Sequence, residues 1–138
     1  MSLETDIAEV DQIISRARTA QADFEKNGSQ ELYDKAAQAV GWAIMEPARN
    51  KELAELAVSS TGLGNVADKI IKNHRKTLGL LRDVAQAKTF GIIAEDSEKG
   101  LTKTARAIGV VGAVAPSPNS LATPANTIIT ALKCCQSI

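Results

Sequence analysis

The chain has 138 residues, of which 44% are hydrophobic and 23% are charged, and its formal net charge is zero. This length suits one compact domain or part of a larger protein, and the apolar content excludes a disordered chain. Balanced charge and 3% aromatic residues argue against a protein that binds nucleic acid or an anionic membrane surface. No apolar run approaches the ~20 residues of a membrane-spanning helix, so we expect no membrane insertion.

The first 45 residues have the apolar spacing of two helices. The first runs from about Leu3 to Glu25 and stops at Asn27-Gly28. Ser29 is placed to cap the second helix, and Pro47 ends or kinks it. The apolar residues that recur along the first helix are Ile7, Val10, Ile14, Ala17 and Phe24. The buried stripe expected of the second helix is Tyr33, Ala36, Ala37, Val40 and Ile44.

Two further helices are predicted up to residue 88. Asn50 is placed to cap a short third helix that Gly62 and Gly64 close. Asn65, with Asp68 three positions later, opens the fourth helix. The apolar residues of this helix are Val66, Ile70, Ile71, Leu78 and Leu81.

The periodicity changes after residue 88. Residues 90–94 and 101–106, joined by a turn at 96–100, predict a two-stranded excursion. Residues 107–115 are a run of small and β-branched apolar residues, which is typical of a strand buried on both faces of a parallel sheet. After a loop, Thr123 and Pro124 begin a last helix that reaches Ser137. Such a strand and helix require a return strand, which we do not expect before Ile138, so we interpret the chain as the front portion of a larger α/β protein.

The loop between the expected strand and the last helix is the candidate ligand site, because open α/β sheets bind ligands there. Asn119 lies in this loop, and its amide could donate to a developing oxyanion. A turn asparagine that bonds its own backbone is the commoner role. Gly109 and Gly112 are spaced as GxxG, which is not a dinucleotide fingerprint, and we interpret them as helix-packing positions.

Other polar residues have ordinary structural interpretations. We expect His74 at the boundary of an apolar face. Cys134 and Cys135 lie in an apolar stretch far in sequence from this only histidine, so we interpret them as packing residues and predict no metal site. For Lys69, Lys72, Arg75 and Lys76, a solvated helix face is favoured over a phosphate anchor for a large cofactor.

The adjacent cysteines and the N-terminus favour a reducing, cytoplasmic location. Two neighbouring cysteines cannot join distant parts of one chain. The first seven residues carry acids where a secretory signal carries basic and then apolar residues.

Two long segments resemble the CoA-acylating aldehyde dehydrogenases. Residues 60–74, STGLGNVADKIIKNH, are similar to the family's ETG-G-v-DK--KN segment, with Ser60 in place of the usual glutamate. Residues 103–120, KTARAIGVVGAVAPSPNS, are similar to its strand and P-x-x-N loop, in which Pro118 is unusual. Residues 127–133 continue the match.

The resemblance implies an incomplete aldehyde dehydrogenase fold of the α/β class. Residues 1–138 would be the N-terminal part of an NAD(P)-binding domain. They divide into a helical preface at 1–88, a β-hairpin arm at 89–106 and the first strand-loop-helix unit of a Rossmann-like domain at 107–138. The arm implies a homo-oligomer through residues 90–106, because its unpaired edges need a partner.

The resemblance also implies an activity. The full-length enzyme would oxidise a small aldehyde, such as sulfoacetaldehyde or acetaldehyde, to its acyl-CoA with NAD or NADP and coenzyme A, through a cysteine thiohemiacetal and thioester. Asn119 would stabilise the oxyanion, and the backbone at Ala115, Pro116, Ser117 and Pro118 would line the nicotinamide side of the cofactor cleft. The family's catalytic cysteine lies beyond Ile138, so we expect this polypeptide alone to be inactive.

Two alternatives stay open. One is a helical interaction or assembly module without catalysis, which docks through its amphipathic first helix at residues 7–24. The other is a non-acylating aldehyde dehydrogenase, which a P-W-N loop would support and residues 116–119 do not.

Overall fold

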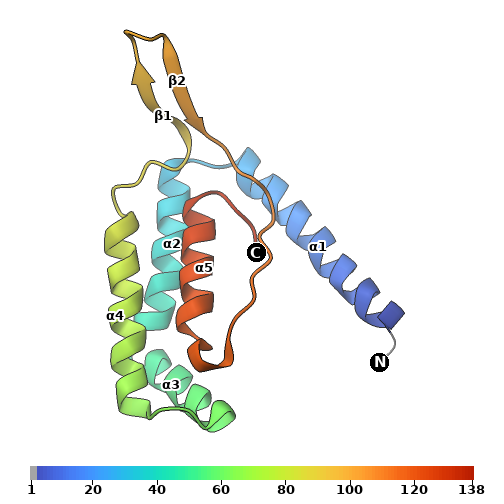
Figure 1. Ribbon diagram of the computed structural model, residues 1–138, viewed down its shortest axis with the longest axis vertical. Coiled ribbons are helices and arrows are strands. Elements are labelled where there is room, and N and C mark those ends of the chain that lie inside the picture. The colour runs from blue at the N-terminus through green and yellow to red at the C-terminus, as the bar shows by residue number, and fades with distance from the viewer. Residues whose placement is uncertain (1–2) are drawn as a thin grey trace.

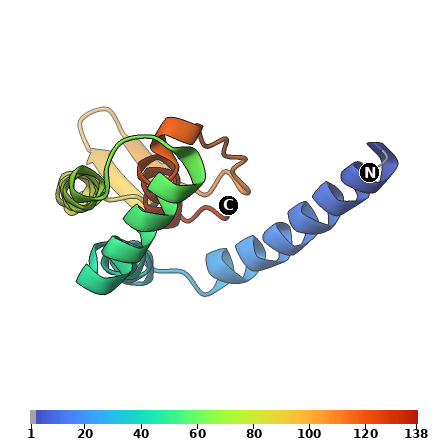
Figure 2. The same ribbon diagram turned by 90° about the horizontal axis from the view of Figure 1, so that it is seen from below.

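The computed structural model describes residues 3–138 as a helical protein with one β-hairpin. Its elements are α1 (Leu3–Lys26), α2 (Gln30–Met45), α3 (Pro47–Thr61), α4 (Val66–Val84), β1 (Gly91–Asp96), β2 (Leu101–Ala105), the 3-10 turn η1 (Ser117–Asn119) and α5 (Ala122–Lys133). Helices α2, α4 and α5 lie side by side, with α3 across one end and the hairpin projecting from the other (Figure 1). Helix α1 extends away from this bundle (Figure 2).

The core lies between α2 and α5 and is built around one tyrosine. Tyr33 is fully buried, and its ring meets Phe24 and Phe90 edge-on at centroid distances of 4.8 and 5.2 Å. Most of the other buried apolar side chains are small, which lets the helices approach closely. The buried apolar residues are Tyr33, Ala37, Ile44, Ala54, Ala57, Ala125, Ile129, Ala131 and Cys135.

The helix caps confirm most of the predicted boundaries. The side chain of Ser29 accepts a hydrogen bond from the Leu32 amide, and Asn65 accepts one from the Asp68 amide. Gly62 ends α3 in the left-handed conformation, with φ of 65°.

The prediction that Asn50 caps α3 is wrong. Glu46 is the cap, because Pro47 suits the first helical position and the Glu46 carboxylate accepts from the amides of Ala48 and Arg49. Asn50 lies inside α3, where it is buried. It donates to the Ile70 carbonyl at 3.0 Å and accepts from the Asn73 amide at 2.9 Å, so it joins α3 to α4.

The apolar residues of the first helix are largely exposed. Ile7, Val10 and Ile14 on α1 are 52%, 53% and 37% exposed, respectively. Helical spacing defines an apolar stripe, but burial needs a partner, and α1 is attached to the rest of the fold near its C-terminal end. There Gln21 donates to the Cys135 carbonyl at 2.7 Å.

The hairpin is confirmed. Strands β1 and β2 pair antiparallel from Gly91–Ala105 to Asp96–Leu101, with an irregularity between Ile92 and Ala94. The base of the hairpin is fixed to α2, because the amide of Thr89 donates to the Gln30 side chain at 2.8 Å. Most of the hairpin is exposed.

The predicted buried strand at residues 107–115 does not form. The segment is extended, but its strand-like pairing in the described residues is a single parallel bridge between Val110 and Ser137. The Val111 amide donates to the Ser137 carbonyl at 2.8 Å, while Ile108 and Val114 are 87% and 95% exposed. A doubly buried strand needs neighbours on both sides, and residues 3–138 supply one residue.

The last helix ends earlier than predicted. It stops at Lys133, because Cys135 adopts a left-handed φ of 56° and the Gln136 amide returns to the Ala131 carbonyl. The chain then turns back, so Ser137 supplies the parallel pairing that we did not expect before Ile138. The Gln136 side chain strengthens this closure by accepting from the amides of Ile108 and Gly109 at 3.2 and 3.0 Å.

The structure corrects the packing role expected for the two glycines. A Cβ atom at Gly109 or Gly112 would meet nothing within 4 Å, so neither lies against a helix in residues 3–138. Gly109 is required instead for its backbone, since its φ is +116°. No helix in the described part of the chain is both long and apolar enough to cross a membrane.

Candidate functional site

Asn119 lies at the end of the 3-10 turn between the extended segment and α5. Its backbone amide donates to the Pro116 carbonyl at 3.1 Å, and this bond closes the turn. Pro116 and Pro118 restrict the backbone on either side of Ser117. The Asn119 side chain is therefore presented to solvent from a stiff turn.

A lysine from α4 orients the Asn119 side chain. Lys72 Nζ donates to Asn119 Oδ1 at 2.5 Å, across 47 positions of sequence. An ammonium group has only donors, so this contact identifies the oxygen end of the amide. The Nδ2 hydrogens then point away from Lys72 and have no acceptor within residues 3–138. The contact with Lys72 therefore fixes the orientation of the Asn119 side chain and leaves its Nδ2 group as a hydrogen-bond donor. Within the described residues, this side chain does not bond its own backbone, as that of a turn asparagine commonly does.

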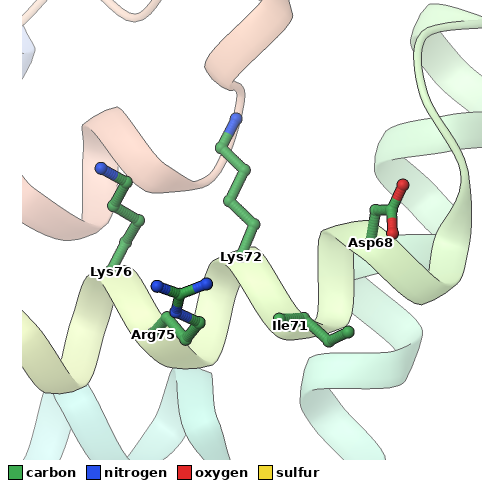
Figure 3. A pocket seen from close by; sticks show the side chains of 5 residues that line it. All are labelled: Asp68, Ile71, Lys72, Arg75 and Lys76. Atoms are coloured by element: carbon green, nitrogen blue, oxygen red, sulfur yellow. The ribbon is translucent and has the colours of Figure 1, made fainter.

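The α4 hollow, a depression of about 410 Å³, lies beside this contact and is lined by Asp68, Ile71, Lys72, Arg75 and Lys76 (Figure 3). Lys72 and Lys76 extend from α4 toward the last third of the chain (Figure 3). Asp68 accepts from the Asn65 amide at 2.6 Å. Within residues 3–138, the three cations form no ion pair. Unpaired positive charge therefore predominates in the hollow.

The pattern of burial along α4 explains why these cations lie on an accessible surface. Its buried residues are the polar Asn73 and Thr77, whereas the apolar Ile71 and Leu78 are 55% and 50% exposed. His74 is exposed rather than at an apolar boundary. Of the predicted solvated face, Arg75 and Lys76 are exposed, and Lys72 is half-buried by its approach to Asn119.

The predicted cofactor segment, Ala115, Pro116, Ser117 and Pro118, lies next to Asn119 and is exposed. In the described part of the chain, the backbone groups of residues 112–115 form no hydrogen bond. Exposed backbone donors and acceptors are thus available along one side of Asn119.

The two cysteines are unsuited to catalysis, as the sequence indicates. Cys135 is 1% exposed, and its thiol donates to the Tyr33 hydroxyl at 2.8 Å. Burial raises the pKa of the Cys134 thiol, against the opposing charge of Lys133. No group of three potential metal ligands occurs among residues 3–138.

The fold of this chain is similar to part of the aldehyde dehydrogenase fold. A crystal structure of a probable aldehyde dehydrogenase from Listeria monocytogenes matches 96% of this chain with a TM-score of 0.89 and 31% identity. An acetylating aldehyde dehydrogenase from Geobacillus thermoglucosidasius matches 96% with a TM-score of 0.82 and 30% identity. This chain covers 28% of each of those chains.

Relatives in sequence indicate which kind of aldehyde dehydrogenase the chain resembles. The chain is 58% identical, over 91% of its length, to a sulfoacetaldehyde dehydrogenase (acylating) of Cupriavidus necator. It is 43% identical over 87% to a sulfoacetaldehyde dehydrogenase of an Acholeplasma species. The chain spans about a quarter of the length of these curated relatives. No protein-family model matches it. The chain is therefore a homologue of part of the acylating aldehyde dehydrogenases, which confirms the resemblance of its two motifs.

Proposed function

We propose that the protein containing this chain is an NAD(P)-dependent, CoA-acylating dehydrogenase that oxidises sulfoacetaldehyde to its acyl-CoA. The 58% identity to the Cupriavidus enzyme carries the proposal. Relatives named for sulfoacetaldehyde are 41% to 58% identical to this chain, whereas a succinate-semialdehyde dehydrogenase of Clostridium kluyveri is 35% identical. The acylating names favour this function over a non-acylating dehydrogenase and over an interaction module without catalysis.

Asn119 serves as the oxyanion donor in this reaction. A cysteine thiolate outside this chain adds to the aldehyde carbon, and the carbonyl electron pair moves to oxygen. The free Nδ2 hydrogens of Asn119 donate to that oxygen, while Lys72 holds the other end of the amide. When the oxyanion collapses, hydride leaves the carbon and a thioester remains, from which the thiolate of coenzyme A displaces the cysteine.

NAD(P)+, when bound, accepts the hydride. Residues 112–115 fit such a ligand, because their backbone groups are exposed and form no hydrogen bond within residues 3–138. Small side chains at Gly112, Ala113 and Ala115 leave room for a flat ring to approach this backbone. Residues 115–118 would then line the nicotinamide side of the cleft.

The finer architecture belongs to the same proposal. The parallel bridge between Val110 and Ser137 around α5 supports residues 107–138 as the first strand-loop-helix unit of a Rossmann-like domain, preceded by the helical preface and the arm. On the hairpin, Ile92 and Leu101 are 56% and 62% exposed, which supports homo-oligomerisation through residues 90–106. Two free cysteines support a reducing, cytoplasmic location.

The test uses the full-length protein with sulfoacetaldehyde, acetaldehyde and succinate semialdehyde. NAD(P)H formation that requires coenzyme A, with the largest kcat/KM for sulfoacetaldehyde, is expected. Reduction without coenzyme A would refute acylation, and a preference for another aldehyde would refute the substrate.

Asn119→Ala should lower kcat about a hundredfold to a thousandfold with little change in the KM for NAD(P)+. The neighbouring Ser120→Ala is the matched control and should leave kcat within about twofold. An unchanged kcat in Asn119→Ala would remove Asn119 from the mechanism.

A further inference from the structure

We propose that Lys72 and Arg75 of α4 bind the sulfonate of the substrate and so set the enzyme's preference for an anionic aldehyde. The inference rests on the proposed function and deepens it, because it names the residues that select sulfoacetaldehyde. It assigns a substrate subsite to the α4 hollow.

The position of Lys72 carries the inference. In sulfoacetaldehyde a single methylene separates the sulfonate from the aldehyde carbon. A group that binds the sulfonate must therefore be the immediate neighbour of the group that binds the carbonyl oxygen. Lys72 Nζ lies 2.5 Å from Asn119 Oδ1, so the ammonium is adjacent to the proposed oxyanion donor. Only one of its three donor hydrogens is used by Asn119.

The charge around Lys72 suits a sulfonate. Arg75 lies three positions further along α4, which places it on the same side of the helix as Lys72. Both line the α4 hollow together with Lys76, and none of the three pairs with a carboxylate in the described chain. Asp68, at the other end of the hollow, is held by the Asn65 amide. The guanidinium of Arg75 and the ammonium of Lys72, which line the same hollow, supply charge-assisted donors for a trigonal set of anionic oxygens.

A phosphate of NAD(P)+ or coenzyme A presents similar oxygens to the same cations. The contact with Asn119 favours the substrate, because Lys72 lies at the other end of the same amide group whose Nδ2 hydrogens would bind the carbonyl oxygen. A cofactor phosphate would need cations that lie away from it.

The experiment compares Arg75→Met and Lys72→Met in the full-length enzyme, with Lys69→Met as the matched control. Lys69 is a basic residue of the same helix that does not line the hollow. The readout is the ratio of kcat/KM for sulfoacetaldehyde to kcat/KM for acetaldehyde, at saturating NAD(P)+ and coenzyme A. We expect this ratio to fall about tenfold or more in both variants, and to stay within about twofold in Lys69→Met. Arg75 is exposed, so its replacement leaves folding intact.

The outcomes separate this inference from the proposed function. An unchanged ratio in Arg75→Met and Lys72→Met overturns the subsite and leaves the function standing. A raised KM for NAD(P)+ or coenzyme A with an unchanged ratio also overturns it, in favour of a cofactor phosphate. If the wild-type protein lacks acylating activity, the proposed function fails, and the Kd of ethanesulfonate decides the subsite. A Kd about tenfold weaker in Arg75→Met supports the subsite, and an equal Kd overturns it.

Discussion

The buried ion pair between α2 and α5 should respond unequally to the removal of its two partners. Lys133 Nζ lies 2.5 Å from Asp34 Oδ1, and the side chains are 4% and 30% exposed, respectively. Asp34 also accepts from Gln30 at 2.7 Å. Asp34→Asn leaves a buried ammonium without a counter-charge, whereas Lys133→Met leaves a carboxylate that water can still reach.

The expected costs follow from this difference in burial. Breaking a buried ion pair costs roughly 3–5 kcal/mol when the remaining charge is enclosed. We expect about 3 kcal/mol for Asp34→Asn, because the asparagine oxygen can still accept a hydrogen bond. For Lys133→Met we expect about 1 kcal/mol, because the methionine fills the space and Asp34 is partly solvated. Asp34→Asn combined with Lys133→Met should cost no more than Asp34→Asn alone.

Native-state hydrogen exchange of the α2 and α5 amides in the full-length protein measures these local free energies. Lys35→Met, at an exposed pair with Glu31, is the matched control and should change exchange little. An equal cost for the two substitutions, or a larger one for Lys133→Met, would refute the argument that burial of Lys133 governs the pair.

Because of the same ion pair, the free energy of unfolding should depend on pH in the acidic range. Burial raises the pKa of Asp34, but the hydrogen bonds from Lys133 and Gln30 and the charge of Lys133 outweigh it, so the pKa lies below its usual value. Its contribution is therefore present above the ordinary carboxyl pKa and is lost as pH falls through the lowered one. Asp34→Asn should remove this acid-dependent loss in α2 and α5.

Three further predictions concern packing, thiol reactivity and assembly. Gly41→Ala should lower the apparent Tm, because its Cβ would lie 2.5 Å from the Leu81 side chain. Gly79→Ala, whose Cβ would meet nothing within 4 Å, should stabilise the protein by about 1 kcal/mol. Equal shifts in Tm for the two variants would contradict this packing. Alkylation of Cys134 at neutral pH should be slower than that of a free cysteine, since burial raises its thiol pKa, and mass spectrometry of tryptic peptides would expose a faster reaction. Leu101→Lys should reduce the oligomer mass in sedimentation, and an unchanged mass would exclude this side chain from the interface.

Local signals allowed most helix ends to be predicted. Ser29 and Asn65 each cap a helix through the amide three positions further along, so their role is encoded within one turn. Asn50 was predicted wrongly as the cap of α3, because a polar residue near a proline resembles a cap. Glu46, directly before Pro47, is the residue that caps the helix. Such choices between neighbouring caps depend on the turn that forms.

Local sequence signals could not predict which face of a helix is buried or which residues distant in the sequence are in contact. The apolar spacing at Ile71 and Leu78 is helical, but α4 packs through Asn73 and Thr77, which hydrogen bonding and the neighbouring helices decide. The sequence placed Asn119 in a loop, and its site role stays a prediction. Its contact with Lys72 spans 47 positions, and no local pattern encodes it. The expected strand failed for the same reason, since a strand is defined by its neighbours.

The closure formed by Gln136 has a consequence for folding. Its side-chain oxygen joins Gly109 across 27 positions, and closing a loop of this length costs about 3 kcal/mol of chain entropy. The Ser137 bond to Val111 then forms within a loop that is already closed and adds little to that cost. The turn that bears Asn119 and all of α5 lie inside this loop, so they should gain and lose order together as one cooperative unit.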